Sequence, residues 1–182
     1  MIDDRTMTRA MAGDRHAFGD LVDTCGPRLV RFAARMVGDR ESARDIVQNA
    51  LVGLWLSRST YRPSGSPEAF LIRVVRNACI DHIRGNRGRI DVRLHDDFDG
   101  VVPSCEGKVL GDALGEALDQ ALLKLPEAQR IVFVLSEYDG LSYQEIADIV
   151  GCPHGTVASR KHAAMEAIRR MLAPWRELDD PM

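Results

Sequence analysis

Hydrophobic side chains recur along most of this chain at intervals of three and four residues, and no stretch alternates as a half-buried β-strand does. This three- and four-residue spacing of hydrophobic side chains is unbroken between 40 and 56, where most of the intervening positions are polar or charged. The pattern predicts an all-α protein built from amphipathic helices.

Capping residues and helix breakers divide this pattern into separate predicted helices. Asp14 and Asp39 stand where N-caps are expected. Pro27 is expected to open a new helix, because proline cannot donate a backbone hydrogen bond, and Gly85 is expected to end one. The predicted helices are 6–12, 14–25, 27–38, 40–56, 66–84, 114–125 and 126–138.

The segment 90–111 interrupts the helical pattern. It is rich in Gly, Pro, Asp and Ser and has no hydrophobic periodicity, so it is predicted to be a flexible acidic linker. The linker separates two small helical bundles, at 1–89 and 112–173, and a short tail follows at 174–182.

The stretch 141–172 predicts a helix-turn-helix. Ser142 and Glu145 have the spacing of a capping box, and Gly151 ends the helix that the box starts. The following Cys-Pro-His-Gly is expected to form the turn, and a second helix with a cationic outer face is expected from Thr156. In such motifs the second helix lies in a DNA major groove. The alternative is an ordinary helical hairpin inside a bundle.

The formal net charge of −3 is unevenly distributed. Residues 70–93 hold six arginines and two aspartates, a net charge of +4, and residues 155–171 reach +3. Between them, residues 94–127 hold eight acidic residues and two lysines, a net charge of −6. Two cationic blocks separated by an anionic one indicate two surfaces that face DNA and a linker that DNA repels.

The polar faces of two predicted helices differ in charge. Between 66 and 84, arginines dominate one face and a single aspartate accompanies them, which favours a track of phosphate contacts. That face consists of Arg73, Arg76, Asn77 and Arg84, and Arg87 extends it beyond the predicted helix end. Between 40 and 56, the outer face carries Asp45, Gln48, Asn49 and Val52, and spacing alone favours a merely solvated face.

Tyr61 lies in the loop 57–66 between Arg58 and Arg62. An exposed aromatic ring flanked by cations can stack on an unpaired base. The ring can equally fold back onto the core of the protein. The sequence leaves both interpretations open.

Motifs of several other protein classes are missing from the sequence. No Walker, dinucleotide-binding, nucleophile-elbow or HExxH pattern occurs, so neither a cofactor nor an enzyme is expected. The four cysteines form no CxxC pair and the five histidines are scattered, so no metal site is predicted. The longest apolar run, 131–135, is too short to cross a membrane, so no membrane insertion is expected, and the cysteine usage indicates a reducing cytoplasm.

The chain resembles a known family, the bacterial sigma factors of the extracytoplasmic-function (ECF) type within the sigma-70 family. Three segments resemble sigma region 2: AGDRHAFGDLVD, DRESARDIVQNALVGLWL and FLIRVVRNACIDHIR. The segment that resembles sigma region 4 is LPEAQRIVFVLSEYDGLSYQEIADIVGCPHGTVASRKHAAMEAIRR. The chain departs from the family pattern at Asn49, where an acid is usual, and at Phe70, where tryptophan is usual.

The resemblance implies a protein that binds core RNA polymerase, directs it to promoters and helps to open the duplex. It replaces the solvated-face interpretation, because Asp45, Gln48, Asn49 and Val52 would then dock on polymerase. The minus-10 element would be bound by Tyr61, Arg62, Arg73, Arg76, Asn77, Arg84 and Arg87. The minus-35 element would be read by His154, Gly155, Thr156, Ser159, Arg160 and Lys161.

The resemblance also implies a regulator, since members of this family are commonly held inactive by an anti-sigma factor. The main alternative is a helix-turn-helix regulator that binds an operator without core polymerase. An arginine-bearing helix beside a loop suited to base capture argues against that alternative.

Overall fold

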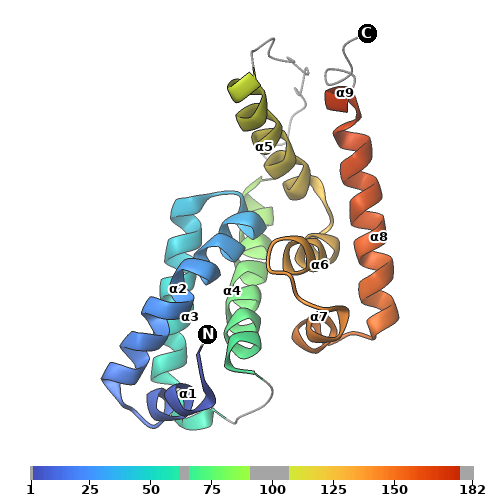
Figure 1. Ribbon diagram of the computed structural model, residues 1–182. Coiled ribbons are helices and arrows are strands. Elements are labelled where there is room, and N and C mark those ends of the chain that lie inside the picture. Colours follow the sequence, from blue (N-terminus) through green and yellow to red (C-terminus); the bar gives the residue numbers. More distant parts are fainter. Residues whose placement is uncertain (1, 62–65, 91–106, 177–182) are drawn as a thin grey trace.

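The computed structural model describes residues 2–61, 66–90 and 107–176, and these residues form helices with no β-strand among them (Figure 1). The prediction of an all-α protein is therefore confirmed. Most of the predicted linker, 91–106, lies outside the described residues, as does the tail from 177 onward.

The first bundle has four α-helices and one short 3-10 helix. Aspartates cap α1, α2 and α3 by accepting hydrogen bonds from first-turn amides, and Ser66 Oγ accepts one from the amide of Ala69 at 3.1 Å at the start of α4. Leu21, Phe32 and Val75 are among its fully buried side chains. The elements are α1 Asp4–Met11, α2 Arg15–Val37, α3 Arg40–Leu56, η1 Arg58–Thr60 and α4 Pro67–Ile90.

Helix α2 is one continuous helix, and the predicted break at Pro27 is wrong. Pro27 has no amide hydrogen to donate to the carbonyl of Asp23, one turn earlier. Both residues are exposed, so water can replace the missing hydrogen bond. Cys25 and Leu29, on either side of the proline, are both buried in the same core. This shared burial holds the two halves of α2 on one axis. Helix α1 also begins two residues earlier than predicted, because Asp3 caps it.

Two further helix ends differ from the predictions. Helix α4 runs through Gly85 to Ile90, and α5 begins at Gly107, inside the predicted linker. A glycine ends a helix where the backbone turns into the left-handed region, as at Gly38 (φ 81°) and Gly151 (φ 73°). Gly85 does not have a positive φ, so the chain continues helically through it.

The second bundle brings together the helix-turn-helix and the helices that precede it. The predicted capping box is present: Glu145 N donates to Ser142 Oγ at 3.3 Å, and Ser142 N donates to Glu145 Oε2 at 2.8 Å. Ile146, Ile149 and Val157 are fully buried beneath the turn. The elements are α5 Gly107–Lys124, α6 Glu127–Glu137, α7 Tyr143–Val150, α8 His154–Met171 and α9 Ala173–Arg176.

One local prediction in this bundle is wrong. His154 and Gly155 form the first turn of α8 instead of the preceding loop, since Pro153 occupies the N-cap and fixes the chain for helix entry. Tyr138, directly after α6, is 37% exposed. Its ring contacts a cation of the first bundle, because Arg35 Cζ lies 3.8 Å from the ring centroid.

The two bundles pack against each other. Helix α4 contacts α2 and α3 on one side and α7 on the other, while α2 also contacts α5 and α6 (Figure 1). One cluster of buried apolar residues includes Leu71 and Val75 from α4 together with Ile131 and Ile149 from the second bundle. The apolar core of the first bundle therefore continues into the second.

Candidate nucleic-acid interface

The predicted minus-35 residues lie on the first two turns of α8. His154, Gly155 and Ser159 are exposed. Ser159 Oγ donates to the carbonyl of Thr156 at 3.1 Å, and Arg160 Nη1 lies 3.6 Å from Cys152 Sγ. The start of α8 therefore presents small and polar side chains to solvent, with half-buried Thr156, Arg160 and Lys161 beside them.

Lys161 is paired within the protein. Its Nζ lies 2.7 Å from Glu137 Oε1, and it also lies 5.3 Å from the centroid of the Tyr143 ring. The hydrogen bond between Lys161 and Glu137 lowers the pKa of Glu137 and raises the pKa of Lys161, so both side chains stay charged at neutral pH. A phosphate that binds Lys161 must compete with Glu137.

The predicted minus-10 arginines lie on the side of α4 that faces the second bundle. Arg73 Nη2 donates to the carbonyl of Asp148 at 3.2 Å, and Arg76 Nη1 donates to that of Ile149 at 2.5 Å. Arg84 Nη2 lies 3.5 Å from Glu127 Oε1. All three arginines therefore contact the second bundle.

The environment of the Arg76 guanidinium favours a negatively charged partner. Its pKa is lowered chiefly by burial and then by the neighbouring cation Arg73. Arg76 Nε and Nη2 donate to Asn77 Oδ1 at 3.1 and 2.7 Å, so Asn77, which is exposed, fixes the orientation of the guanidinium. A pair of adjacent, partly buried arginines is stabilised by oxygen acceptors with negative charge.

Two predicted minus-10 residues cannot be placed fully. Arg62 lies outside the described residues. Arg87 lies within α4, which is longer than predicted, but its side chain lies outside the described part of the structure. The sequence prediction for both residues stays a prediction.

Tyr61 folds back onto the first bundle. Its ring centroid lies 4.9 Å from that of Phe70 in an edge-to-face arrangement, and burial raises the pKa of its hydroxyl. The two rings line a cavity of about 340 Å³, together with Ala50, Leu54 and Val74. Of the two interpretations, the structure has the ring packed on the core, with a cavity beside it.

The predicted polymerase face of α3 is open to solvent. Asp45, Gln48 and Asn49 are exposed, and Val52 is 50% exposed. Leu56, one turn beyond Val52, is 73% exposed and was missed by the sequence analysis. Its spacing of four residues from Val52 was the available signal. A polar cluster followed by two uncovered apolar side chains is typical of a protein-binding surface.

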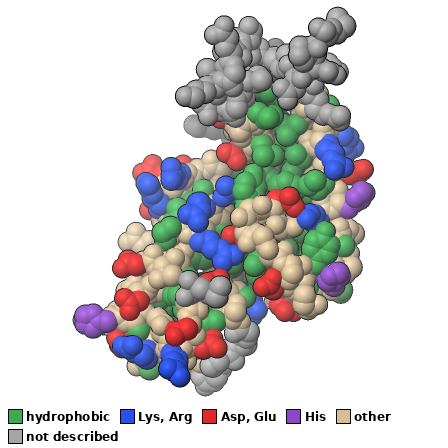
Figure 2. Space-filling view, in the orientation of Figure 1, with side chains coloured by type: hydrophobic (Ala, Val, Ile, Leu, Met, Phe, Trp, Pro, Cys, Tyr) green, Lys and Arg blue, Asp and Glu red, His purple; other side chains and the backbone are tan. Residues whose placement is uncertain are grey.

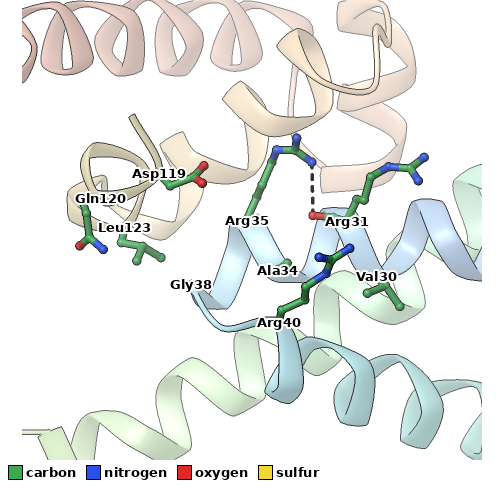
Figure 3. A pocket seen from close by; sticks show the side chains of 9 residues that line it. All are labelled: Val30, Arg31, Ala34, Arg35, Gly38, Arg40, Asp119, Gln120 and Leu123. Atoms are coloured by element: carbon green, nitrogen blue, oxygen red, sulfur yellow. Dashed lines mark hydrogen bonds between the residues drawn. The ribbon is translucent and has the colours of Figure 1, made fainter. Parts of the chain in front are cut away.

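A third cationic feature, besides those on α4 and α8, was not predicted. A cavity of about 410 Å³ lies between α2 and α5, and Figure 3 shows Arg31, Arg35 and Arg40 around it with Asp119 and Leu123 opposite. None of the predicted site residues lines this cavity. The four-residue spacing of Arg31 and Arg35 in the sequence places both on one face of α2.

The described residues contain no group of three His, Cys, Asp or Glu side chains placed to hold a metal ion. Burial raises the pKa of the Cys79 thiol to about 12, and Cys25 is also buried, so both thiols stay protonated and unreactive. No helix in the described part of the chain combines the length and the hydrophobicity that spanning a bilayer requires.

Comparisons with known proteins identify two family regions in this chain. Residues 9–89 match the family model of Sigma-70 region 2, and residues 115–168 match that of Sigma-70 region 4. The first match contains α3 and most of α4, and the second contains the helix-turn-helix.

Whole-chain relatives carry the same description. The chain is 32% identical to the ECF RNA polymerase sigma factor SigW of Bacillus subtilis over 88% of its length and 91% of the relative's. It is 32% identical to the RNA polymerase sigma-H factor of Pseudomonas aeruginosa, covering 94% of each chain.

Two solved structures share the fold at lower identity. They are the sigma factor RpoE in complex with the anti-sigma factor NepR from Bartonella quintana and CnrH in complex with the cytosolic domain of CnrY. Their TM-scores are 0.66 and 0.70, their identities 23% and 24%, and the matches cover 86% and 93% of this chain and 96% of each neighbour. Together with the region 2 and region 4 matches, the relatives show that this chain belongs to the ECF RNA polymerase sigma factors.

Proposed function

We propose that this protein binds core RNA polymerase, positions it at promoters by contacting the minus-35 and minus-10 elements, and promotes strand opening for transcription initiation. The observation that carries the proposal is the presence of two cationic helices, α4 and α8, on two bundles of one chain, together with an uncovered face on α3. The proposed units are a region 2 domain at 1–89 and a region 4 domain at 112–173.

Helix α8 would read the minus-35 element from the major groove. Its exposed N-terminal residues, His154 and Gly155, would enter first, and Thr156, Ser159, Arg160 and Lys161 would follow on the same helical face. An arginine that bonds both acceptors of a guanine discriminates against other bases by about 1–3 kcal/mol. Arg160 is the residue we assign to that contact.

The first bundle would act on the minus-10 element. Opening about ten base pairs costs roughly 15 kcal/mol at about 1.4 kcal/mol per stacked step. Trapping one or two unstacked bases returns about 1–3 kcal/mol each, so polymerase must supply the remainder. The cavity beside Tyr61 and Phe70 is the place we assign to a trapped base. Four residues of α4 would hold the strand: Arg73, Arg76, Asn77 and Arg84. Arg62 and Arg87 are proposed as further contacts from the sequence alone.

The α3 face would dock on core polymerase. Asp45 supplies a charge, Gln48 and Asn49 supply amide groups, and Val52 supplies apolar area next to them. Leu56 extends the apolar part by one turn. Protein interfaces usually combine polar and apolar area in this way.

We further propose that an anti-sigma factor regulates this protein, that it acts in the cytoplasm, and that it carries out no enzymatic reaction of its own. The proposal of a regulator is supported by two structural neighbours, one in complex with the anti-sigma factor NepR and one in complex with the cytosolic domain of CnrY.

The polymerase assignment is tested by charge reversal on α3. Asp45→Arg should abolish co-elution with core polymerase in gel filtration, while circular dichroism shows unchanged helicity, because Asp45 is exposed and makes no contact with the core. Asp20→Arg is the matched control, since it reverses an equally exposed carboxylate on α2. Wild-type protein that fails to co-elute would instead favour an operator-binding regulator that acts without polymerase.

A further inference from the structure

Three arginines from two neighbouring helices surround the cavity between α2 and α5. The cavity has a volume of about 410 Å³, and Figure 3 shows Arg31 and Arg35 of α2 and Arg40 of α3 on one side of it. Asp119 and Leu123 of α5 lie on the other side. Sites for small molecules in proteins have volumes of about 300–1,000 Å³. The cavity is therefore large enough to hold a small organic ligand.

The turn at Gly38 brings the third arginine to the other two. Gly38 ends α2 in the left-handed region, with a φ of 81°, and the chain enters α3 at Arg40. A Cβ atom at residue 38 would collide with the side chain of Leu123. The glycine therefore positions Arg40 and also lets α5 pack closely against the end of α2. Gly38 and Leu123 both line the cavity that results.

The positive charges around the cavity are not balanced by the described residues. Arg31 and Arg40 are exposed, and neither takes part in the ion pairs that join described residues. Of the described residues that line the cavity, Asp119 is the only acid, and it is not paired with an arginine. Arg31 and Arg35 are four residues apart on one helix, where like charges repel each other. A ligand with several negative charges would relieve this repulsion.

Arg35 is oriented by contacts within the protein. Its Cζ lies 3.8 Å from the centroid of the Tyr138 ring, and its Nη1 donates a long hydrogen bond of 3.5 Å to the carbonyl of Arg31. A guanidinium has five N–H donors, so these two contacts leave other donors for oxygen acceptors. A side chain whose orientation is already fixed loses less conformational entropy when it binds a ligand.

The charge and the shape of the site favour linked phosphates. The planar fork of a guanidinium matches two oxygens of a phosphate, which makes arginine well suited to phosphate binding. Three guanidinium groups around one cavity match a ligand with more than one phosphate. The phosphates of duplex DNA lie along a rigid rod that cannot enter a cavity of this size. A small molecule with linked phosphates can enter it.

The α5 side of the cavity fits a nucleoside. Asp119 and Gln120 are exposed and polar, and carboxylate and amide groups hydrogen-bond the hydroxyls of a ribose. Val30 and Leu123 add apolar surface against which a base can pack. The charge of Asp119 repels phosphate, so a ligand would direct its phosphates toward the arginines and its ribose toward α5.

We propose that the cavity between α2 and α5 binds a nucleoside diphosphate, with its phosphates on Arg31, Arg35 and Arg40 and its ribose beside Asp119 and Gln120. Figure 2 shows Lys and Arg side chains gathered where the first bundle approaches the second, a distribution that attracts an anion from solution. The site is separate from the surfaces assigned to DNA and polymerase, because none of their residues lines it.

Isothermal titration calorimetry of the full chain, without divalent cations, tests the site. The diphosphates of adenosine, guanosine, uridine and cytidine are titrated separately, together with the four nucleosides and pyrophosphate. At least one diphosphate should bind at one site per chain, more weakly as salt is added, and its nucleoside should not bind measurably. A nucleoside that binds as tightly as its diphosphate would overturn the proposal, as would the absence of binding by all four diphosphates.

A pair of arginine variants locates the binding. Arg31→Gln with Arg40→Gln removes two exposed cations of the cavity, so affinity for the diphosphate should fall at least about 30-fold while circular dichroism shows unchanged helicity. Arg15→Gln with Arg44→Gln is the matched control, because it removes two exposed arginines of α2 and α3 that do not line the cavity. The control should bind within about twofold of the wild type. Equal losses would overturn the site, since they would show attraction to net charge alone.

An acid variant separates the two halves of the ligand. Asp119→Ala should weaken diphosphate binding about fivefold or more, because the ribose loses an acceptor. Pyrophosphate should bind this variant at least as tightly as the wild type, because a repelling charge is gone. Wild-type protein that binds pyrophosphate as tightly as the diphosphate would overturn the nucleoside assignment. The polymerase test with Asp45→Arg uses a different surface, so failure of the ligand site would leave the proposed function unaffected.

Discussion

Helices α4 and α8 carry the two cationic surfaces that the sequence predicted. The surface on α4 is packed against the neighbouring bundle, whereas the surface on α8 is largely open to solvent. The arginines of α4 contact backbone carbonyls and a carboxylate of the second bundle. The first turns of α8 instead present His154, Gly155 and Ser159 to solvent, and only Lys161 is paired with a carboxylate. The first turns of α8 are therefore open to solvent, whereas the basic side of α4 is packed against the second bundle.

The difference follows from the position of each helix in the fold. Helix α4 lies between its own bundle and α7, so its basic side is also a domain interface. Helix α8 packs on α5, α6 and α7 within its own bundle, which leaves its N-terminal outer face free of the first bundle's helices in the described contacts.

The largest expected effect is at α4 in the presence of polymerase. Arg76→Glu should reduce open-complex formation by about 100-fold or more, because a charged hydrogen bond worth about 1.5–3 kcal/mol is lost and a repulsion is added. Permanganate reactivity of unpaired thymines at a promoter measures the opening. Arg169→Glu, an exposed reversal in the last turn of α8, should keep more than half of the wild-type signal. Equal losses would contradict a special role for α4.

At α8, Arg160→Ala should weaken promoter binding by about 1–3 kcal/mol if it reads a guanine. The loss should fall on one base pair, so the variant should stop discriminating there while keeping its preferences elsewhere. Binding to a set of promoters with single substitutions measures this. A uniform loss on every sequence would make Arg160 a phosphate contact instead.

The preformed state of the helix-turn-helix depends on its capping box. Ser142→Ala should lower the free energy of unfolding of the second bundle by about 1 kcal/mol, because the amide of Glu145 loses its acceptor. Chemical denaturation measures the change. Ser136→Ala, inside α6, should cost less, since its hydroxyl contacts only the Glu137 carboxylate at 3.3 Å. An equal cost at both serines would contradict the cap's importance.

The smallest expected effect is at Lys161 and Glu137. The pKa of Glu137 is lowered, so the stability that its charge contributes is fully present above its ordinary pKa and is lost as pH falls through the lowered pKa. The pKa of Lys161 is raised, so the stability that its charge contributes is lost only as pH rises through the raised pKa. Glu137→Gln should therefore cost less than about 1 kcal/mol, constant from pH 6 to pH 9. Thermal melts across that range measure it, and a steep pH dependence would contradict the assignment.

Local signals predicted much of the fold. The aspartate caps of α2 and α3 and the Ser142 capping box act over two or three residues, so the sequence contains them in full. The break at Pro27 was wrong because burial of Cys25 and Leu29 on both sides of the proline outweighed its local preference. The end at Gly85 was wrong because a glycine ends a helix only where its backbone turns left-handed, which the sequence does not show.

The site residues were predicted as three separate sets, without the spatial relation between them. The residue types on α3, α4 and α8 follow from helical spacing and from the family resemblance. No local pattern pairs Arg28 with Asp139, 111 residues later, or Arg76 with Ile149, 73 residues later. The contact of the basic side of α4 with the second bundle depends on those distant pairs, so the sequence could not predict it.

The central claim is that this chain enables core polymerase to start transcription from promoters with two separated elements. Run-off transcription with core polymerase from its own organism and fragments of genomic DNA tests it most directly. The account predicts transcripts that require the protein and whose templates share one sequence block near minus-10 and another near minus-35. Absence of any transcript dependent on the protein would contradict it.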